Sequence, residues 1–386
     1  MKILFPTGSF FPAQTGGPDN TVYWITKALK QKGVTAEVVS SERGLSATIP
    51  RNEWLKKDYA DVIYTTNLIH YFPFRLILAA LSELKKVDVL HLSMIFYPAS
   101  FLIAIVNALF YKKPVVWSIH GDLDPPMLNR SKWKKRPIQL LIKYWLKNKV
   151  IFHSTCDAET QYVKDTFGQN IQVVQLTNYM ELPTPIKVKK ENFFLYLGRI
   201  DPKKAIENLI EALHQSDLFI PSDFQLKIAG NHHNAYGKQL VELVKKLNLQ
   251  HKVKFIGHIS GDAKQRLLAG AHFLFMPSHT ENFGIVVTEA LAQGTPAVAS
   301  KRTPWKILED KSAGFWIEND IKSLGRCIDD ILALHPKSYQ EMCKNTRPLA
   351  NEYFNIQNNI YKWQEVYETL ANHTTKFAKV LELERK

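Results

Sequence analysis

The chain has 386 residues, of which 45% are hydrophobic, 22% charged and 11% aromatic. This length suffices for two hydrophobic cores, and the composition excludes a largely disordered chain. The net charge of +14 indicates an anionic partner, such as a phosphorylated small molecule, an acidic membrane surface or nucleic acid. Three scattered cysteines, Cys156, Cys327 and Cys343, form no paired metal-ligand pattern and are expected to be reduced thiols.

The first half of the chain alternates short β-rich runs with amphipathic helical segments. The opening residues MKILFPTGSFF predict a buried strand rather than a signal peptide, because they lack a long apolar core. A helix carrying Val22, Ile25 and Leu29 follows and ends at Gly33. Further strands are predicted at VTAEVVS, DVIYTT, VDVLHLS, PVVWSIH and KVIFHST. This alternation is typical of a parallel α/β sheet.

Residues 94–111 contain no charged side chain, and this length is near the lower limit for crossing a bilayer. Pro98, Ser100 and Asn107 interrupt the apolar run, which lies between two predicted strands. We therefore expect a buried crossover helix here rather than a membrane span.

The alternation breaks near residues 178–190, at NYMELPTPIKVKK, and then restarts with predicted strands at NFFLYLG, FQLKIAG, KVKFIGH, HFLFMPS and TPAVAS. Two prolines and a basic run make this segment typical of an interdomain linker. The sequence thus predicts two doubly wound parallel-sheet units, at 1–183 and 184–355, and a helical tail at 356–386. Ligands bind such sheets at the carboxyl ends of the strands, so we expect the site in a cleft between the units.

Two motifs in the second unit carry chemistry suited to phosphates and hydroxyls. GRIDPKK, residues 198–204, places Arg199 and Lys204 between a predicted strand and a helix start, where they can bind phosphate or form a solvated basic turn. In SHTENFGIVVTEALAQG, Glu281 precedes a helix predicted to begin near Phe283 or Gly284, and Glu289 lies inside that helix. The backbone amides of residues 282–284 suit a diphosphate.

Each carboxylate also has an ordinary interpretation. Glu281 can be an acid favoured by the helix dipole. Glu289 lies among apolar neighbours, so it needs a partner, which can be a ligand hydroxyl or a buried lysine or arginine.

The ordered set GRIDPKKA, KIAG, KVKFIGH and PSHTENFGIVVTEALAQGTPAVAS resembles the family-4 retaining glycosyltransferases of GT-B fold. The resemblance covers nearly all of the second unit, and the first unit agrees at Gly16-Gly17, SIHG and LTNYMELP. It implies two Rossmann-like domains that face each other across a cleft, the first binding the acceptor and the second the nucleotide-sugar donor. It also implies that the C-terminal helix within 356–386 packs back on the first domain. It also implies transfer of a sugar from a UDP- or GDP-sugar to a glycan or lipid-linked acceptor, in cell-envelope polysaccharide or lipopolysaccharide synthesis.

The resemblance further implies the role of each site residue. Arg199 and Lys204 would hold the donor diphosphate, Glu281 would bind the donor sugar, and Glu289 would bind the ribose. The remaining donor-binding positions would be Gly16, Gly17, Asn282, Phe283 and Gly284, which act through the backbone, and His120 would lie beside the reacting carbon. Two cations and a helix start can stabilise the leaving group, so no metal or other cofactor is expected.

Some positions leave the interpretation open. An isolated histidine such as His120 is more often structural, although its place before Gly121 at a sheet edge favours catalysis. Ala205 and Tyr179 stand where the family usually has glycine, which puts the shapes of two loops in doubt. Asp122-Leu123-Asp124 is the one Asp-x-Asp match, and its neighbouring prolines favour a turn.

The acceptor side is less defined. Lysines and arginines around IQLLIKYWL, within residues 132–149, predict either a surface helix on anionic lipid or an ordinary amphipathic helix. We expect a cytoplasmic protein, with attachment to the inner face of the plasma membrane as the lipid-binding alternative. Nucleic-acid binding rests on net charge alone and is not expected.

Two other functions remain open at this stage. One is a nucleotide-sugar epimerase or sugar phosphorylase of the same fold. The other is a non-catalytic nucleotide-sugar-binding protein. The donor base, the sugar, the linkage and the oligomeric state cannot be read from these residues.

Overall fold

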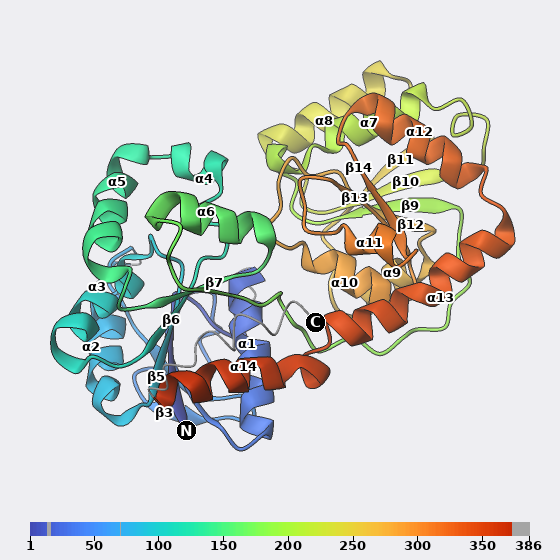
Figure 1. The fold of residues 1–386 in the computed structure, drawn as a ribbon. Coiled ribbons are helices and arrows are strands. Elements are labelled where there is room, and N and C mark those ends of the chain that lie inside the picture. The colour runs from blue at the N-terminus through green and yellow to red at the C-terminus, as the bar shows by residue number, and fades with distance from the viewer. Residues whose placement is uncertain (14–16, 70, 373–386) are drawn as a thin grey trace. The chain divides into compact units, whose positions relative to one another are not determined.

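The computed structural model describes residues 1–13, 17–69 and 71–372. The chain divides into two compact units (Figure 1): unit 1 contains residues 1–181 and the C-terminal segment from Ile356, and unit 2 contains residues 182–355. The division thus falls two residues before the predicted boundary at 183/184. The C-terminal helix belongs to unit 1, although all of unit 2 separates it in the sequence from the rest of unit 1.

Unit 1 contains an eight-stranded sheet in the order β3-β4-β2-β1-β5-β6-β7-β8. All pairs are parallel except β3 with β4, which is antiparallel at the sheet edge and was not predicted. A three-residue strand leaves no recognisable β-rich run in the sequence. The strands are β1 (Lys2–Thr7), β2 (Thr35–Ser41), β3 (Trp54–Lys56), β4 (Asp61–Thr65), β5 (Val89–Ser93), β6 (Val115–Ser118), β7 (Ile151–Ser154) and β8 (Val173–Gln175).

Helices cover both faces of this sheet, because side chains of successive strand residues point to opposite faces. Ile3 and Phe5 pack with α1 (Gly17–Gln31) and α14 (Ile356–Ala371). Leu4 lies in the core on the other face. That face is covered by α2 (Phe74–Glu83), η1 (Leu84–Lys86), α3 (Pro98–Val106), η2 (Asn107–Tyr111), η3 (Ile142–Leu146) and α6 (Asp157–Phe167), while α4 (Pro125–Asn129) and α5 (Lys132–Leu141) contain no buried residue.

The crossover helix predicted for residues 94–111 is confirmed. It consists of α3 followed by the π-helical turn η2, and it connects β5 to β6. In the part of the chain that the structure describes, no helix combines the length and the apolarity that a membrane span requires.

The C-terminal helix α14 is fixed to the sheet of unit 1 by a buried hydrogen-bond chain. The Tyr367 hydroxyl contacts His91 Nδ1, His91 Nε2 contacts Ser118 Oγ, and Ser118 Oγ contacts His153 Nδ1, each at 2.7 Å. His153 Nε2 lies 2.8 Å from the Leu176 carbonyl and must therefore be the protonated nitrogen.

The contact between His153 and the Leu176 carbonyl determines which atom is the donor in each of these hydrogen bonds. A neutral His153 leaves Nδ1 as an acceptor, so Ser118 donates to it. Ser118 then accepts from His91 Nε2, and Tyr367 donates to His91 Nδ1. Burial lowers the pKa of His153 to about 4 and that of His91 well below 6.5, which fits two neutral rings.

Acid should therefore weaken unit 1 through these histidines. Below about pH 6.5 the two histidines become protonated in the unfolded chain but stay neutral in the folded protein. Their contribution to the free energy of unfolding is therefore greatest above that pH and is lost on acidification. Asp122, whose pKa burial raises to about 6, acts in the opposite direction. We expect the drop in unfolding free energy between pH 7.5 and pH 5 to be about 2 kcal/mol larger in the wild type than in His153→Asn. Urea titrations measure it, and equal drops would contradict the assignment.

Unit 2 contains a six-stranded parallel sheet in the order β11-β10-β9-β12-β13-β14. Its strands are β9 (Phe193–Leu197), β10 (Gln225–Ala229), β11 (Val253–Gly257), β12 (Phe273–Met276), β13 (Ala297–Ser300) and β14 (Gly314–Ile317). The first five correspond to predicted runs. The strand β14 was not predicted.

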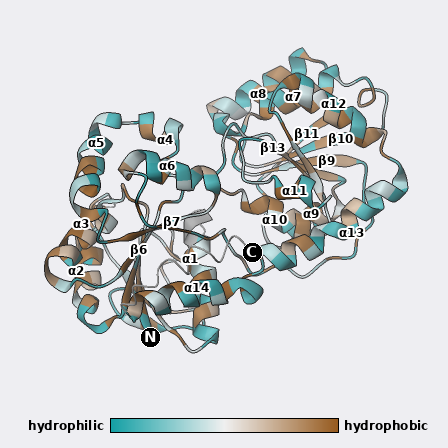
Figure 2. Cartoon of the chain, viewed as in Figure 1, coloured by the Kyte–Doolittle hydropathy of each residue, from teal (hydrophilic) through white to brown (hydrophobic). Residues whose placement is uncertain are grey.

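The helices of unit 2 also form two layers. One layer contains α7 (Ile206–Gln215), α8 (Ala235–Lys246) and α12 (Ile321–Leu332). The other contains α9 (Gly261–Gly270), α10 (Ile285–Ala292), α11 (Ile307–Asp310) and α13 (Pro336–Tyr353). Figure 2 shows hydrophobic residues on the strands and mixed polarity on the helices, as expected for a sheet covered on both faces. The prediction of two parallel-sheet α/β domains is confirmed.

Candidate active site

The two motifs of unit 2 follow neighbouring strands at the point where the strand order reverses. The turn 198–205 follows β9, and the segment 277–284 follows β12, which pairs with β9 in the parallel direction. The His279 amide donates to the Lys203 carbonyl at 2.9 Å and joins the two segments. Ligands of doubly wound sheets bind at such a reversal point, so this edge is the candidate donor site.

The turn after β9 is built by its own sequence. The Asp201 carboxylate accepts the Lys203 amide at 3.0 Å and caps the short helix η4 (Pro202–Lys204). Ala205 then takes a left-handed conformation, with φ 47° and ψ 45°. The position where the family usually has glycine therefore keeps a glycine-like backbone in spite of the alanine.

Lys204 and Glu281 meet directly across the two segments. The Lys204 ammonium contacts the Glu281 carboxylate, and each side chain is 17% exposed, so both can still reach a ligand. Arg199 is exposed at the same edge. Tyr196, whose hydroxyl donates to the Arg199 carbonyl at 2.7 Å, experiences the charges of both Glu281 and Arg199. Burial, reinforced by the Glu281 charge, raises the pKa of Tyr196 well above its usual value.

The helix α10 begins at Ile285, one or two residues later than predicted. Gly284 is its N-cap and has φ 82°, so the amides of Asn282, Phe283 and Gly284 belong to the turn before the helix. A Cβ at Gly284 would lie 2.4 Å from Met276 Sδ, which excludes any larger residue without movement. Phe283 is buried, and its carbonyl accepts the Trp305 indole N–H.

Phe283 therefore anchors the turn in the core. Its ring packs 5.2 Å from that of Trp305 and 5.6 Å from that of Phe354, measured between centroids. The sequence indicated only its backbone role, because nothing in the motif shows where the ring points.

Glu289 has a partner that the sequence did not identify. Its Oε1 lies 2.5 Å from the Lys264 ammonium, and the two side chains are 10% and 24% exposed. Lys264 stands on α9, 25 residues earlier in the chain, where no motif marks it. A lysine or arginine was one of the two partners that the sequence left open for Glu289, and the ion pair with Lys264 leaves the second carboxylate oxygen for a ligand.

His120 lies at the carboxyl end of β6 in unit 1. It has φ 51°, an uncommon left-handed conformation for histidine, and Gly121 follows with φ 81°. Burial, with the nearby His153, lowers the pKa of His120 to about 3. Its Nε2 atom is enclosed and makes no hydrogen bond to any residue that the structure describes. A neutral ring with one unused nitrogen is suited to a ligand hydroxyl.

Glu159 holds the turn that carries His120. Its carboxylate accepts the Gly121 amide at 2.6 Å and the Thr155 amide at 2.6 Å. Burial raises the pKa of Glu159 above its usual value, and these hydrogen bonds only partly offset the rise. This role could not be predicted from the sequence, because an acid in the first turn of a helix is ordinary.

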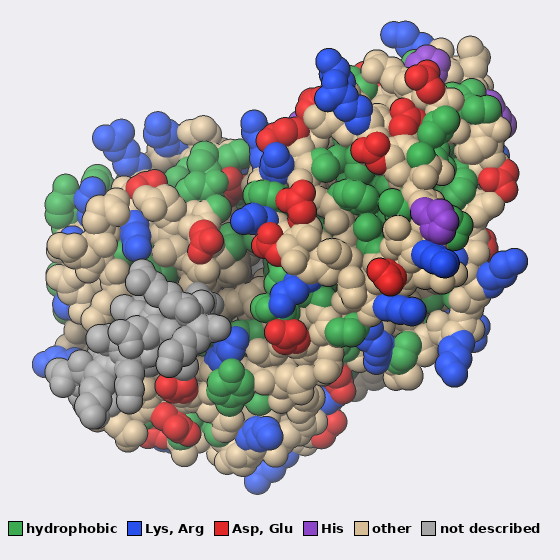
Figure 3. All heavy atoms as spheres, turned by 45° about the vertical axis from the view of Figure 1, so that its right-hand side comes forward, with side chains coloured by type: hydrophobic (Ala, Val, Ile, Leu, Met, Phe, Trp, Pro, Cys, Tyr) green, Lys and Arg blue, Asp and Glu red, His purple; other side chains and the backbone are tan. Residues whose placement is uncertain are grey.

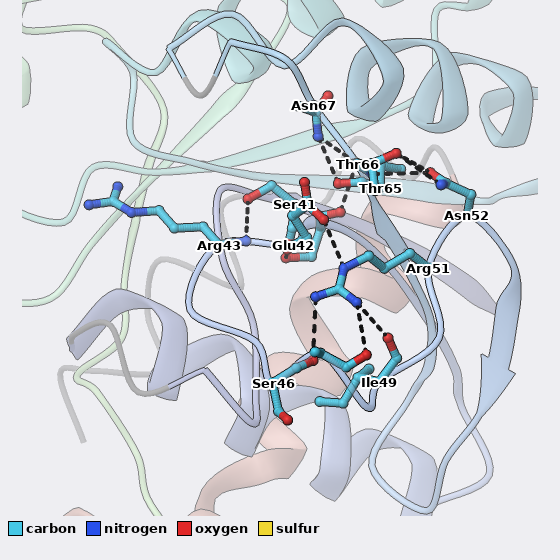
Figure 4. Close-up of polar contacts among 12 residues, drawn as sticks. Ser41, Glu42, Arg43, Ser46, Ile49, Arg51, Asn52, Thr65, Thr66 and Asn67 are labelled. Carbon is cyan, nitrogen blue, oxygen red and sulfur yellow. Dashed lines mark hydrogen bonds and ion pairs between the residues drawn. The ribbon is translucent and has the colours of Figure 1, made fainter.

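The loops after β2 and β4 are fixed at the same edge of unit 1 (Figure 4). The Arg51 guanidinium contacts Glu42 at 2.7 Å and donates to three backbone carbonyls, those of Ser46, Ala47 and Ile49. Arg43 is exposed and extends away from this cluster. Of the predicted glycine pair, Gly17 is the first residue of α1, and Gly16 lies outside the described residues.

Asp122 and Asp124 lie in the turn between β6 and α4. Asp122 Oδ2 accepts the Phe96 amide at 3.3 Å, and Asp124 precedes α4. Within the described ranges, no group of three His, Cys, Asp or Glu side chains is placed to hold a metal ion. The absence of a cofactor stays a prediction.

The two parallel-sheet α/β units define a protein of GT-B fold. Two family models match the chain: "Glycosyltransferase Family 4" over residues 15–175 and "Glycosyl transferases group 1" over residues 182–348. Together they cover most of both units. The chain belongs to the group 1/family 4 glycosyltransferases, as its motifs indicated.

Individual relatives agree with this assignment. An uncharacterized glycosyltransferase of Methanocaldococcus jannaschii is 34% identical over 128 residues, which are 33% of this chain and 32% of that protein. The glycogen synthase of Mycobacterium tuberculosis is 25% identical over 335 residues, 78% of each chain. The solved structure of Anabaena Alr3699/HepE in complex with UDP and glucose has a TM-score of 0.74 at 19% identity, covering 96% of this chain and 100% of that one.

Proposed function

We propose that the protein transfers a sugar, with retention of configuration, from a UDP- or GDP-sugar to a glycan or lipid-linked acceptor in the cytoplasm. The observation that carries the proposal is the Lys204–Glu281 ion pair at the strand-order reversal of unit 2. It unites a cation for the diphosphate with a carboxylate for sugar hydroxyls. The UDP bound by the Anabaena protein supports a uridine donor.

Donor binding would change the partners of this pair. In the structure Lys204 and Glu281 neutralise each other. A diphosphate brought to the exposed Arg199 adds negative charge, so Lys204 can turn to its oxygens while Glu281 accepts sugar hydroxyls. Glu289, held by Lys264, would accept the ribose hydroxyls with its second oxygen.

Transfer would break the bond between the sugar carbon and the diphosphate oxygen. The acceptor oxygen forms its bond on the same face, and its proton passes to the departing diphosphate. Charge grows on the leaving group during this step, and Lys204 and Arg199 stabilise it. His120, neutral and held by the Glu159-bound turn, would donate to or accept from the sugar beside the reacting carbon.

A nucleotide panel tests the donor site. We expect UDP or GDP to raise the unfolding temperature with concentration and ADP to raise it less, because a ligand bound only to the folded state stabilises it by mass action. Glu289→Ala should remove most of the shift. A chain that none of the nucleotides stabilises would contradict the donor site.

Transfer itself is tested with radiolabelled donor and mixed acceptors in EDTA. Label should enter the acceptor without added metal. Transfer that is lost in EDTA and restored only by Mg²⁺ or Mn²⁺ would contradict the cofactor-free proposal.

The same products distinguish the other functions. Conversion of the donor sugar to its epimer without an acceptor would identify an epimerase, and phosphate-dependent release of a sugar phosphate would identify a phosphorylase. Binding without any product would identify a non-catalytic protein. The pathway that uses the product stays a prediction.

A further inference from the structure

The helix that follows the His120 turn has an unusual outer face. Trp133 on α5 and Tyr144 on η3 are 75% and 77% exposed, and Leu140 and Leu141 between them are 44% and 39% exposed. Their spacing places them on one side of the helix. A helix resting on a protein core normally turns polar residues outward, so packing in unit 1 does not account for these exposed side chains.

The same helix also has an inner apolar face, which accounts for its attachment to unit 1. Ile142 and Leu146 are buried in the core, and Ile138 and Trp145 pack against it. The interpretation as an ordinary amphipathic helix, with its apolar side inward and lysines in water, therefore explains only these four. Farther along the same helical layer, Leu109 and Phe110 of η2 are 51% and 74% exposed.

Positive charge surrounds the outer face. Ten of the chain's 50 lysines and arginines stand between Lys112 and Lys149, against two carboxylates, Asp122 and Asp124. Asp124 is buried and Asp122 accepts a backbone amide, so neither offsets this charge at the surface. Elsewhere the signs are mixed: on the face shown in Figure 3, lysines and arginines lie among aspartates and glutamates.

We propose that this face, named here the α5 face and formed by residues 132–149, docks on an anionic lipid bilayer. Aromatic and leucine side chains would enter the headgroup region, and the lysines and arginines would bind lipid phosphates. Stable attachment to a membrane takes two such signals, and the α5 face has both. A second copy of the chain fits less well, since a symmetric interface would bring the two basic surfaces together.

The charge of the lipid decides the test. We use the full chain and vesicles of phosphatidylcholine with or without phosphatidylglycerol, and we measure flotation at low and high salt. The protein should float with the phosphatidylglycerol vesicles at low salt and lose most binding at high salt. Trp133→Ser/Leu141→Ser/Tyr144→Ser and, separately, Lys132→Gln/Lys134→Gln/Arg136→Gln should each weaken binding by about tenfold or more.

Matched controls come from unit 2. Leu218→Ser/Ile220→Ser replaces side chains that are 42% and 39% exposed, and Lys238→Gln/Lys337→Gln/Lys344→Gln replaces exposed lysines. Both should float like the wild type, and all variants should keep the wild-type unfolding temperature. Equal flotation of wild type and α5-face variants would overturn the proposal. The proposal would also be overturned if the wild type did not float and instead sedimented as a dimer, and if Trp133→Ser/Leu141→Ser/Tyr144→Ser abolished that dimer.

Discussion

Replacing Lys204 with alanine is expected to lower turnover by about 100- to 1,000-fold, the usual effect of removing one preorganised group that stabilises developing charge. The loss should appear mainly in kcat, because the charge on the leaving diphosphate grows as the bond breaks. Glu281 loses its partner in this variant. Initial rates with the nucleotide-sugar that the panel identifies measure the effect.

Two comparisons make this result specific. Lys245→Ala removes an exposed ion pair, 2.8 Å from Glu242, on a helix of the same unit and should leave turnover unchanged. If Lys204 and Glu281 act on one bound donor, Lys204→Ala/Glu281→Ala should lose less than the product of the two single effects. Near-normal turnover in Lys204→Ala would remove Lys204 from the diphosphate site.

Replacing His120 with alanine is expected to lower turnover by about 100-fold or more, with a smaller effect on nucleotide affinity. The reason is the enclosed Nε2 atom, which has no partner among the described residues, so that in the proposed complex the sugar would supply one. Because the pKa of His120 lies at about 3, the ring is neutral throughout pH 5–9. Its titration should therefore leave no inflection near pH 6.5 in the rate profile.

His120→Asn is the matched variant for this position. Asparagine tolerates the left-handed backbone at φ 51° and keeps a polar group, so it should fold and recover part of the activity that alanine loses. UDP-induced stabilisation should persist in both variants. Wild-type turnover in His120→Ala would assign the histidine a structural role, the interpretation that the sequence left open.

The fold could be predicted where the sequence repeats one pattern. The strands that flank each strand-order reversal are apolar runs followed by loops, and they stand where the patterns placed them. The edge strands β3, β8 and β14 and the short helix α11 were missed, because three or four residues give no period. The start of α10 was misplaced, because the left-handed Gly284 delays the helix.

The candidate site could be predicted only where its residues lie in one motif. Lys204 and Glu281 are 77 residues apart, yet each could be predicted as a site residue because each lies in a motif of its own. Lys264 and Glu159 were missed because they act through partners distant in sequence or through backbone amides. The outward aromatic face of α5 also needed coordinates, because its apolar residues point both inward and outward.

The central claim is that Lys204, Arg199 and the turn before α10 converge on one donor diphosphate. A crystal structure of the full chain with UDP tests it most directly. We expect the diphosphate within hydrogen-bonding distance of the Lys204 ammonium and the Arg199 guanidinium, with the ribose hydroxyls on Glu289. A nucleotide bound elsewhere, with Lys204 still paired to Glu281 and Arg199 in solvent, would contradict the account.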